Sequence, residues 1–238
     1  MNMNQLGWFQ SQPTFRMLGS LILLLALSAC QKTEVEKTRE EQQKHIAQKE
    51  QERYQQEFEQ WKLKQDQVLL KQYQSYFSAY VKQPPSLFEL TFNAHPLKAE
   101  CMDYRFNLPP KKYWKNLIQP LKLLEKLQAT GYFAHYKIVS IYRSQESNDC
   151  ARGVSGSRHL KNLAIDFQTL NEQKQHYPDH EVMEQKLCQF WRKEGKKYRL
   201  GLGVYGKQRF HIDTHGYRTW GKDFSSKSSP CLNHATSK

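Results

Sequence analysis

Two short runs near the C-terminal end constrain the fold of this chain more than any other feature. Residues 157–166 read SRHLKNLAID, and residues 210–220 read FHIDTHGYRTW. Together they supply His159, Asp166 and His211, which are the residue types that hold a zinc ion while leaving its fourth position open. Because the two runs lie far apart in sequence, the fold must return the chain to the same place for these side chains to meet.

Residues 163–170 and 209–213 are strand-like, and on a strand every second side chain shares a face. His211 and Asp213 therefore point to one side and Ile212 to the other. A carboxylate beside a zinc-activated water can take its proton and pass it to a leaving amine. Asp213 is our candidate for this general base, and the alternative is that it supports a metal ligand without binding the metal. Any of these residues taken alone is more often structural, and only their combination indicates a metal site.

The remaining pattern predicts an α+β domain with a small antiparallel sheet and flanking helices. Apolar side chains recur at helical spacing in two segments, and β-branched or alternating runs indicate strands. The expected helices are 113–129 and 181–193, and the expected strands are 136–142, 163–170, 200–205 and 209–213.

A long N-terminal helix precedes this domain. Residues 31–83 are rich in Gln, Glu and Lys and contain no Gly or Pro before Pro84, a composition that favours helix. Aromatic residues from Tyr54 to Tyr80 recur at three- and four-residue steps and form an apolar stripe. We expect the later half to pack on the domain and the polar first part to act as a tether or a coiled-coil partner. Because the two prolines at 84–85 mark a boundary, we assign 30–83 to the helical tether and 84–238 to the zinc domain.

Residues 1–29 resemble the signal peptide of a bacterial lipoprotein. Arg16 precedes an apolar run that is too short for a comfortable membrane span. The run ends in Leu-Ser-Ala-Cys at 27–30, which resembles a lipobox and makes Cys30 the lipidation site. Gln31 after the cysteine implies the outer membrane, so we expect a lipid-anchored protein of the cell envelope that faces the periplasm. Alternatives are an ordinary signal peptide cut after residue 29 or a short anchor.

Four further cysteines follow. An even number in an oxidising compartment indicates two disulfides. Because none has Cys-x-x-Cys spacing, a structural zinc site is not indicated. Three pairings are open, and a bridge to the second of these cysteines would brace the metal loop. The four are Cys101, Cys150, Cys188 and Cys231.

Almost all of the formal net charge of +13 lies beyond residue 80, because residues 31–80 balance nine basic against nine acidic side chains. A basic domain suits a polyanionic partner. Since an exported protein rarely meets nucleic acid, we expect no nucleic-acid partner and favour anionic polymers of the envelope. Plain solubility is the alternative explanation.

Four motifs resemble the zinc D-Ala-D-Ala carboxypeptidase family, which includes VanY-like enzymes and murein endopeptidases and shares its zinc site with hedgehog-type domains. They are Tyr-Arg-Ser at 142–144, Ser-x-His-x6-Asp at 157–166, Gly-Leu-Gly-Val-Tyr at 201–205, and Phe-His-Ile-Asp at 210–213 followed by Trp220. The resemblance covers roughly residues 100–222.

The resemblance implies a hedgehog-like α+β fold and zinc ligation by His159, Asp166 and His211. It also implies that Arg143 holds a substrate carboxylate and that Ser157 contacts substrate or supports a ligand. Two positions depart from the family. Asn162 stands where glycine is common, and Asn tolerates left-handed backbone. His215 stands where relatives have a residue that does not bind the metal, so we expect it at the rim.

The chain therefore reads as a zinc-dependent peptidoglycan peptidase, either a D-Ala-D-Ala carboxypeptidase or a murein endopeptidase. Its expected partners are peptidoglycan and, through the lipid anchor, the membrane. The alternative is a non-catalytic murein-binding lipoprotein that serves as a scaffold. A third possibility keeps the enzyme but gives it another amide as substrate.

Overall fold

The computed structural model describes residues 18–95, 98–206 and 208–233, apart from the side chains of residues 18–33, 35, 37, 40 and 233. The first 17 residues of the expected signal peptide and the side chain of Cys30 lie outside this description, so lipidation stays a prediction. Within the described residues, no helix combines the length and apolar character needed to cross a membrane. The chain divides into two compact units, Met1–Glu57 and Phe58–Lys238.

The first unit is formed by most of helix α1 (Leu18–Leu63). From position 41 to Arg53 its described side chains are exposed. Pairs of side chains four residues apart stabilise it locally, such as Arg53 with Glu57 at 3.1 Å and Gln48 with Glu52 at 3.0 Å, each contributing a few tenths of a kcal/mol.

The second unit begins at Phe58, earlier than the boundary at Pro84 that the sequence predicts. The buried Phe58 ring packs against Phe88 and Phe106 at 5.2 and 5.3 Å, so the last turn of α1 belongs to the globular core. The expected continuous helix is also interrupted after Leu63. Asp66 accepts hydrogen bonds from the first backbone amides of α2 (Gln67–Tyr76), and Asp is strongly preferred at a helix N-cap.

Short helices follow. The structure has 3-10 helix η1 (Phe77–Ala79), α3 (Leu87–Thr91), 3-10 helices η2 (Ala99–Tyr104) and η3 (Lys111–Leu117), and α4 (Ile118–Ala129). The helix expected at 113–129 is thus a 3-10 turn that continues into an α-helix. Beyond α4 come α5 (Gln145–Cys150), 3-10 helix η4 (Arg158–Lys161), α6 (His180–Tyr198), 3-10 helix η5 (Ser226–Ser228) and α7 (Pro230–Asn233).

Five strands form one sheet in the order β1-β2-β4-β3-β5. They are β1 (His135–Ser140), β2 (Ala164–Leu170), β3 (Gly201–Val204), β4 (Arg209–Asp213) and β5 (Arg218–Trp220). The first four match the expected strands closely. The sequence predicts an antiparallel sheet. The observed sheet is mixed, because β5 pairs with β3 in parallel. A strand of three residues is too short to show periodicity, so β5 has no sequence signal.

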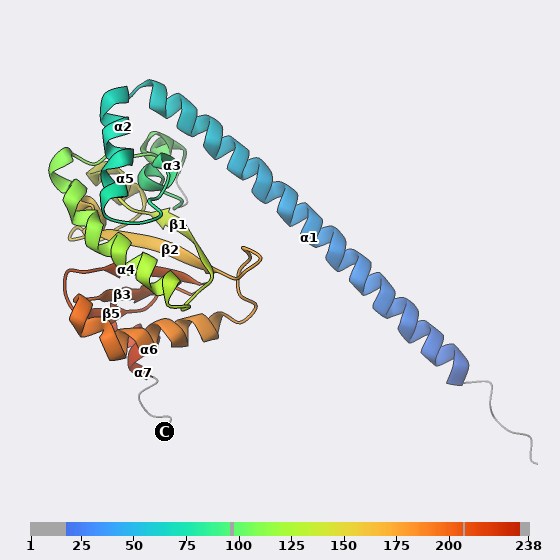
Figure 1. Ribbon diagram of the computed structural model, residues 1–238. Coiled ribbons are helices and arrows are strands. Elements are labelled where there is room, and N and C mark those ends of the chain that lie inside the picture. The colour runs from blue at the N-terminus through green and yellow to red at the C-terminus, as the bar shows by residue number, and fades with distance from the viewer. Residues whose placement is uncertain (1–17, 96–97, 207, 234–238) are drawn as a thin grey trace, which may run out of the picture. The chain divides into compact units, whose positions relative to one another are not determined.

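Helices pack against the sheet. Helix α4 packs against β2 and β4, and α6 packs against β3 (Figure 1). On β4, Phe210 and Ile212 are fully buried, and Phe210 packs with Phe167 of β2. The alternation of strand side chains then directs His211 to the opposite face. The fold is therefore a mixed α+β fold with one sheet. The face of this sheet away from α4 carries the polar residues of the two sequence runs.

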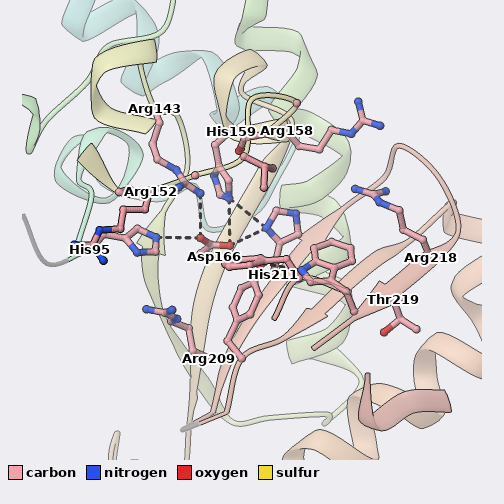
Figure 2. A pocket seen from close by; sticks show the side chains of 18 of the residues that line it. His95, Arg143, Arg152, Arg158, His159, Asp166, Arg209, His211, Arg218 and Thr219 are labelled. Carbon is pink, nitrogen blue, oxygen red and sulfur yellow. Dashed lines mark hydrogen bonds and ion pairs between the residues drawn. The ribbon is translucent and has the colours of Figure 1, made fainter. Parts of the chain in front are cut away.

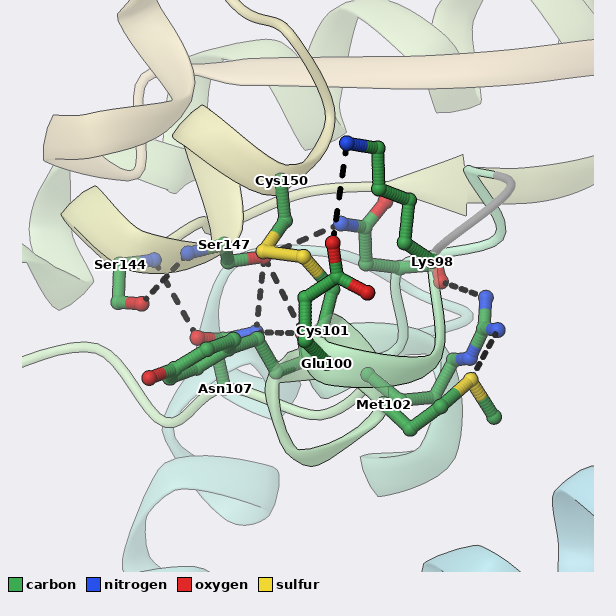
Figure 3. Close-up of a disulfide and its surroundings, with 11 residues drawn as sticks. Lys98, Glu100, Cys101, Met102, Asn107, Ser144, Ser147 and Cys150 are labelled. Carbon is green, nitrogen blue, oxygen red and sulfur yellow. Dashed lines mark hydrogen bonds and ion pairs between the residues drawn. A yellow bond between two sulfur atoms is a disulfide. The ribbon is translucent and has the colours of Figure 1, made fainter.

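Two disulfides resolve the pairing that the sequence left open, joining Cys101 to Cys150 and Cys188 to Cys231. The first ties η2 to the end of α5 (Figure 3). Beside it, Ser147 accepts hydrogen bonds from Asn93 and Asn107 at 3.1 and 3.3 Å. These contacts join the segment around residues 93–107 to the chain that leads into the metal loop.

Removal of either disulfide by a double Cys→Ser substitution is expected to lower the free energy of unfolding by about 4 kcal/mol, because each bridge closes a similar loop. The sequence separations are 49 and 43 residues. Urea unfolding of the two variants, with the unsubstituted chain as reference, checks this. A loss confined to one variant would contradict a stabilisation set by loop length.

Candidate metal centre

Strands β2 and β4 bring two of the predicted ligands together. Asp166 and His211 are direct cross-strand partners, so their side chains leave the sheet on the same face. His159 comes from η4, whose first turn is capped by Ser157, the hydroxyl of which accepts from the His159 amide at 3.4 Å. Asn162 then ends η4 with φ of 56°, in the left-handed region. This turn returns the chain to β2, which agrees with the expectation for Asn162.

Three donor atoms converge at this point. Asp166 Oδ1 lies 3.2 Å from His159 Nε2 and 2.8 Å from His211 Nδ1, and the two ring nitrogens lie 3.2 Å apart (Figure 2). All three side chains are buried. The three predicted ligands are thus adjacent in space, as the sequence predicts.

Neighbouring groups determine the tautomers of both rings. His159 Nδ1 is within hydrogen-bond distance of the Ile141 carbonyl oxygen, which can only accept, so Nδ1 carries the proton. His211 Nε2 lies 3.2 Å from Asp213 Oδ2, a carboxylate that also only accepts, so Nε2 carries the proton there. When both rings are neutral, the lone pairs of His159 Nε2 and His211 Nδ1 are directed at Asp166.

Three lone pairs that face one another in a buried place repel unless a proton or a metal ion lies between them. Two imidazole nitrogens and one carboxylate oxygen form a suitable donor set, and each ring is oriented by a hydrogen bond on its outer nitrogen, as metal-binding histidines usually are. The set His159, Asp166 and His211 can therefore hold a metal ion.

Electrostatics set the protonation of the three groups differently. Burial would lower the pKa of His211, but its hydrogen bonds with Asp166 and Asp213 outweigh this and raise it, so metal binding would release a proton from this ring. Burial, with the nearby Arg143 charge, lowers the pKa of His159 to about 4, so the ring is neutral at pH 7. Burial would raise the pKa of Asp166, but its contacts with His159, His211 and His95 hold that pKa well below its usual range. Asp166 is therefore an ionised carboxylate in the fold.

Asp213 does not occupy the position expected of a general base. Its carboxylate lies at the outer nitrogen of His211, on the opposite side of the ring from Asp166. Arg218 binds both of its oxygens at 3.1 and 2.6 Å, and the residue is fully buried. Asp213 fits instead the other role considered for it, which is to orient and polarise His211.

Two glycines of β3 make room for this arrangement. A Cβ at Gly201 would lie 2.5 Å from Asp213 Oδ2, and a Cβ at Gly203 would lie 2.7 Å from the Trp220 ring. Trp220 in turn packs edge-on against His211, with the ring centroids 5.0 Å apart. The Gly-x-Gly of this strand is therefore a steric requirement of the site.

Two side chains contact the second oxygen of Asp166. Arg143, which is buried, places NH2 3.4 Å from Oδ2, and His95 places Nε2 3.4 Å from the same atom. His95 was not found from the sequence, since no motif surrounds it. It reaches the site because Asn93 pairs with Ser140 at the end of β1 and because Arg105 binds the His95 carbonyl at 2.9 Å.

A pocket of about 430 Å³ opens over the three ligands. Ser157 and Arg143 line it, as predicted for substrate-contacting residues, and Trp220 and Tyr205 add aromatic walls. His215 is exposed and is not part of the ligand set, which agrees with a rim position. Among the described residues that line the pocket, Asp166 is the only carboxylate.

Substitution of a ligand is expected to weaken metal binding. His159→Ala or His211→Ala should reduce zinc affinity by roughly 100-fold or more, since loss of an outer hydrogen-bond partner alone costs roughly 10- to 100-fold. Isothermal titration of the chelator-treated chain measures this. His215→Ala is the matched control and should bind as the unsubstituted chain does. Equal affinity in all three variants would reject the site.

Asp213→Asn is expected to change the pH dependence of stability. Burial raises the pKa of Asp213, but hydrogen bonds from His211 and Arg218 outweigh this and lower it from 3.8 to about 2. A carboxyl group whose pKa is lower in the folded than in the unfolded state stabilises the fold at pH values above its unfolded-state pKa. This stabilisation is lost as the pH falls through its folded-state pKa. In metal-free protein, the variant should be less stable by about 2 kcal/mol at pH 6. The difference from the unsubstituted chain should vanish near pH 2, and urea unfolding across this range measures it. A constant difference would contradict the assignment.

Comparison of the chain with protein-family models, with curated proteins and with solved structures found no match. The assignment of this centre therefore depends on its own geometry. What that geometry establishes is a buried His-Asp-His set at the base of an open pocket, able to hold a metal ion.

Proposed function

We propose that this protein is a zinc-dependent peptidase of peptidoglycan peptides, exported to a bacterial cell envelope and anchored there by a lipid on Cys30. The observation that carries the proposal is the convergence of three oriented lone pairs, from His159, Asp166 and His211, at the base of a pocket. A buried structural zinc usually takes four protein ligands, whereas a catalytic one takes three and keeps a position for water or substrate.

Zinc is the metal that suits this donor set best, because it accepts nitrogen and oxygen ligands in a four-coordinate site. When bound, it would supply a Lewis acid that polarises a carbonyl and lowers the pKa of water. The reaction adds water to the carbonyl carbon of an amide, breaks the C–N bond and transfers a proton to the leaving amine.

The chain's own residues hold this reaction in place. Ile141 and Asp213 fix the rings of His159 and His211 through their outer nitrogens. Arg143 and His95 contact the second oxygen of Asp166. The pocket offers guanidinium groups that suit the carboxylates of a stem peptide.

The motif resemblance supports the same function. Several residues match motifs of zinc D-Ala-D-Ala carboxypeptidases. The three ligands and the arginine of the Tyr-Arg-Ser motif line one pocket. The glycines of the Gly-x-Gly strand make room for Asp213 and Trp220 beside it. Four of the five strands are antiparallel and helices flank the sheet, which is compatible with the expected fold.

One observation favours the alternative of a non-catalytic murein-binding protein. In the described lining of the pocket, no carboxylate other than Asp166 is present, and Asp213 is held by Arg218. A metallopeptidase commonly uses a free carboxylate beside its metal as the general base. A binder would need only the pocket and its charges.

Digestion of purified sacculi separates these functions. The full chain, purified in detergent and loaded with zinc, should release altered muropeptides that mass analysis detects, and a chelator should abolish the change. Loss of a terminal D-Ala would identify a carboxypeptidase, and loss of cross-linked dimers an endopeptidase.

The matched control is His211→Ala, which should be inactive, beside His215→Ala, which should be active. A folded, zinc-loaded chain that leaves sacculi unchanged but sediments with them would reject the peptidase and support the binder.

A further inference from the structure

The pocket over the metal ligands carries many more positive than negative groups. Five arginines line it, against the single carboxylate of Asp166. They are Arg143, Arg152, Arg158, Arg209 and Arg218. Arg143 is paired with Asp166, and Arg218 with Asp213. The other three arginines line the pocket with no carboxylate in its described lining to balance them.

The four arginines other than Arg143 form two groups on opposite sides of the ligands. Figure 2 shows Arg152 and Arg209 on the side of His95, and Arg158 and Arg218 on the far side, beyond His211. We call them the His95-side pair and the His211-side pair. The ligand set lies between them, so a peptide that crosses the ligands passes from one pair to the other.

Three of the four guanidinium groups are available for a ligand. For Arg152, Arg158 and Arg209, no carboxylate of the described residues lies within ion-pair distance. Aromatic neighbours hold two of the arginines in place, since Arg209 lies over Tyr205 at 5.5 Å and Arg218 over Trp220 at 5.0 Å. Side chains positioned in this way lose little freedom when an anion binds.

Arg152 also occupies an unusual backbone position. It has φ of 54°, just after α5, where glycine or asparagine is favoured and another residue costs roughly 1 kcal/mol. The disulfide at Cys150 braces this turn against η2. The chain thus presents a guanidinium to the pocket from a position where glycine would be the more stable choice.

We propose that the pocket selects peptides with a free carboxylate on each side of the amide that it places at the metal centre. The inference rests on the proposed peptidase function and names its substrate class. Guanidinium groups bind carboxylates with two parallel hydrogen bonds, and two separated pairs require two separated carboxylates. A peptide in which either carboxylate is an amide would cover an arginine that has no counter-charge, which is costly. That arginine is Arg158 on the His211 side, and on the His95 side it is Arg152 or Arg209.

The test uses four synthetic cross-linked stem peptides that differ only in amidation: both flanking carboxylates free, either one amidated, or both amidated. The full chain, zinc-loaded in detergent, should cleave the free peptide with the highest kcat/KM. Each amidation should lower kcat/KM by roughly tenfold, corresponding to the loss of one charge-assisted interaction.

Two substitutions assign the pairs to the two sides. Arg152→Gly suits the positive φ and should keep the fold, and Arg158→Gln is its partner on the other side. Each variant should lose discrimination against amidation of one carboxylate only, and the two variants should lose it for different carboxylates. Lys186→Gln removes the same charge from the exposed surface of α6 and should keep both preferences. Loss of discrimination at the same carboxylate in both variants would overturn the proposal.

Isothermal titration of the same four peptides, with and without zinc, gives a readout that does not depend on turnover. Equal cleavage and equal binding of all four peptides would reject the two-carboxylate pocket while leaving the peptidase function intact. Absence of cleavage, with tight binding that weakens on each amidation, would reject the peptidase and keep the inference.

Discussion

The convergence of two imidazole rings and one carboxylate in a buried place is the constraint on which the rest of this domain depends. His159 Nε2, His211 Nδ1 and Asp166 Oδ1 lie within 3.2 Å of one another, an arrangement that needs a shared proton or a metal ion between the three atoms. The fold imposes it through cross-strand pairing of two ligands and hydrogen bonds on the outer nitrogen of each ring. Because contacts with Asp166 and Asp213 raise the pKa of His211, metal binding would displace a proton from this ring and would stabilise the folded state.

The wall of the pocket on the side of His95 comes from segments with little regular structure, and covalent and polar links hold it instead of sheet pairing. The Cys101–Cys150 bridge ties η2 to α5. The side-chain amides of Asn93 and Asn107 donate hydrogen bonds to Ser147 of α5, and Arg105 binds the carbonyl of His95. Disulfides of this kind persist in oxidising compartments, which is compatible with the proposed export. The same links place His95 and Arg152 on one side of the metal ligands.

The sequence predicted the parts of this protein that depend on local pattern and on chemical identity. The α+β class, four strands and the adjacency of His159, Asp166 and His211 follow from periodicity and from a donor set with few other uses. Other features depend on three-dimensional neighbours. Asp213 shares a strand face with His211, as expected, but only the position of Arg218 shows that its carboxylate is already bound. His95 and the parallel strand β5 have no local signature. The second compact unit begins at Phe58, ahead of Pro84, because Phe58 packs against aromatic rings far along the chain.

The positions of the basic side chains indicate a more specific role for the positive charge than solubility. The excess of positive side chains lies beyond residue 80, and five arginines of that region line one pocket. Field lines converge in a concave site with low-dielectric walls, so arginines there attract an anionic ligand more strongly than the same charges spread over a surface. Arg143 is partly neutralised by Asp166, and Arg218 by Asp213. These two arginines therefore support the metal ligands, which leaves Arg152, Arg158 and Arg209 as the groups whose charge an incoming substrate must balance.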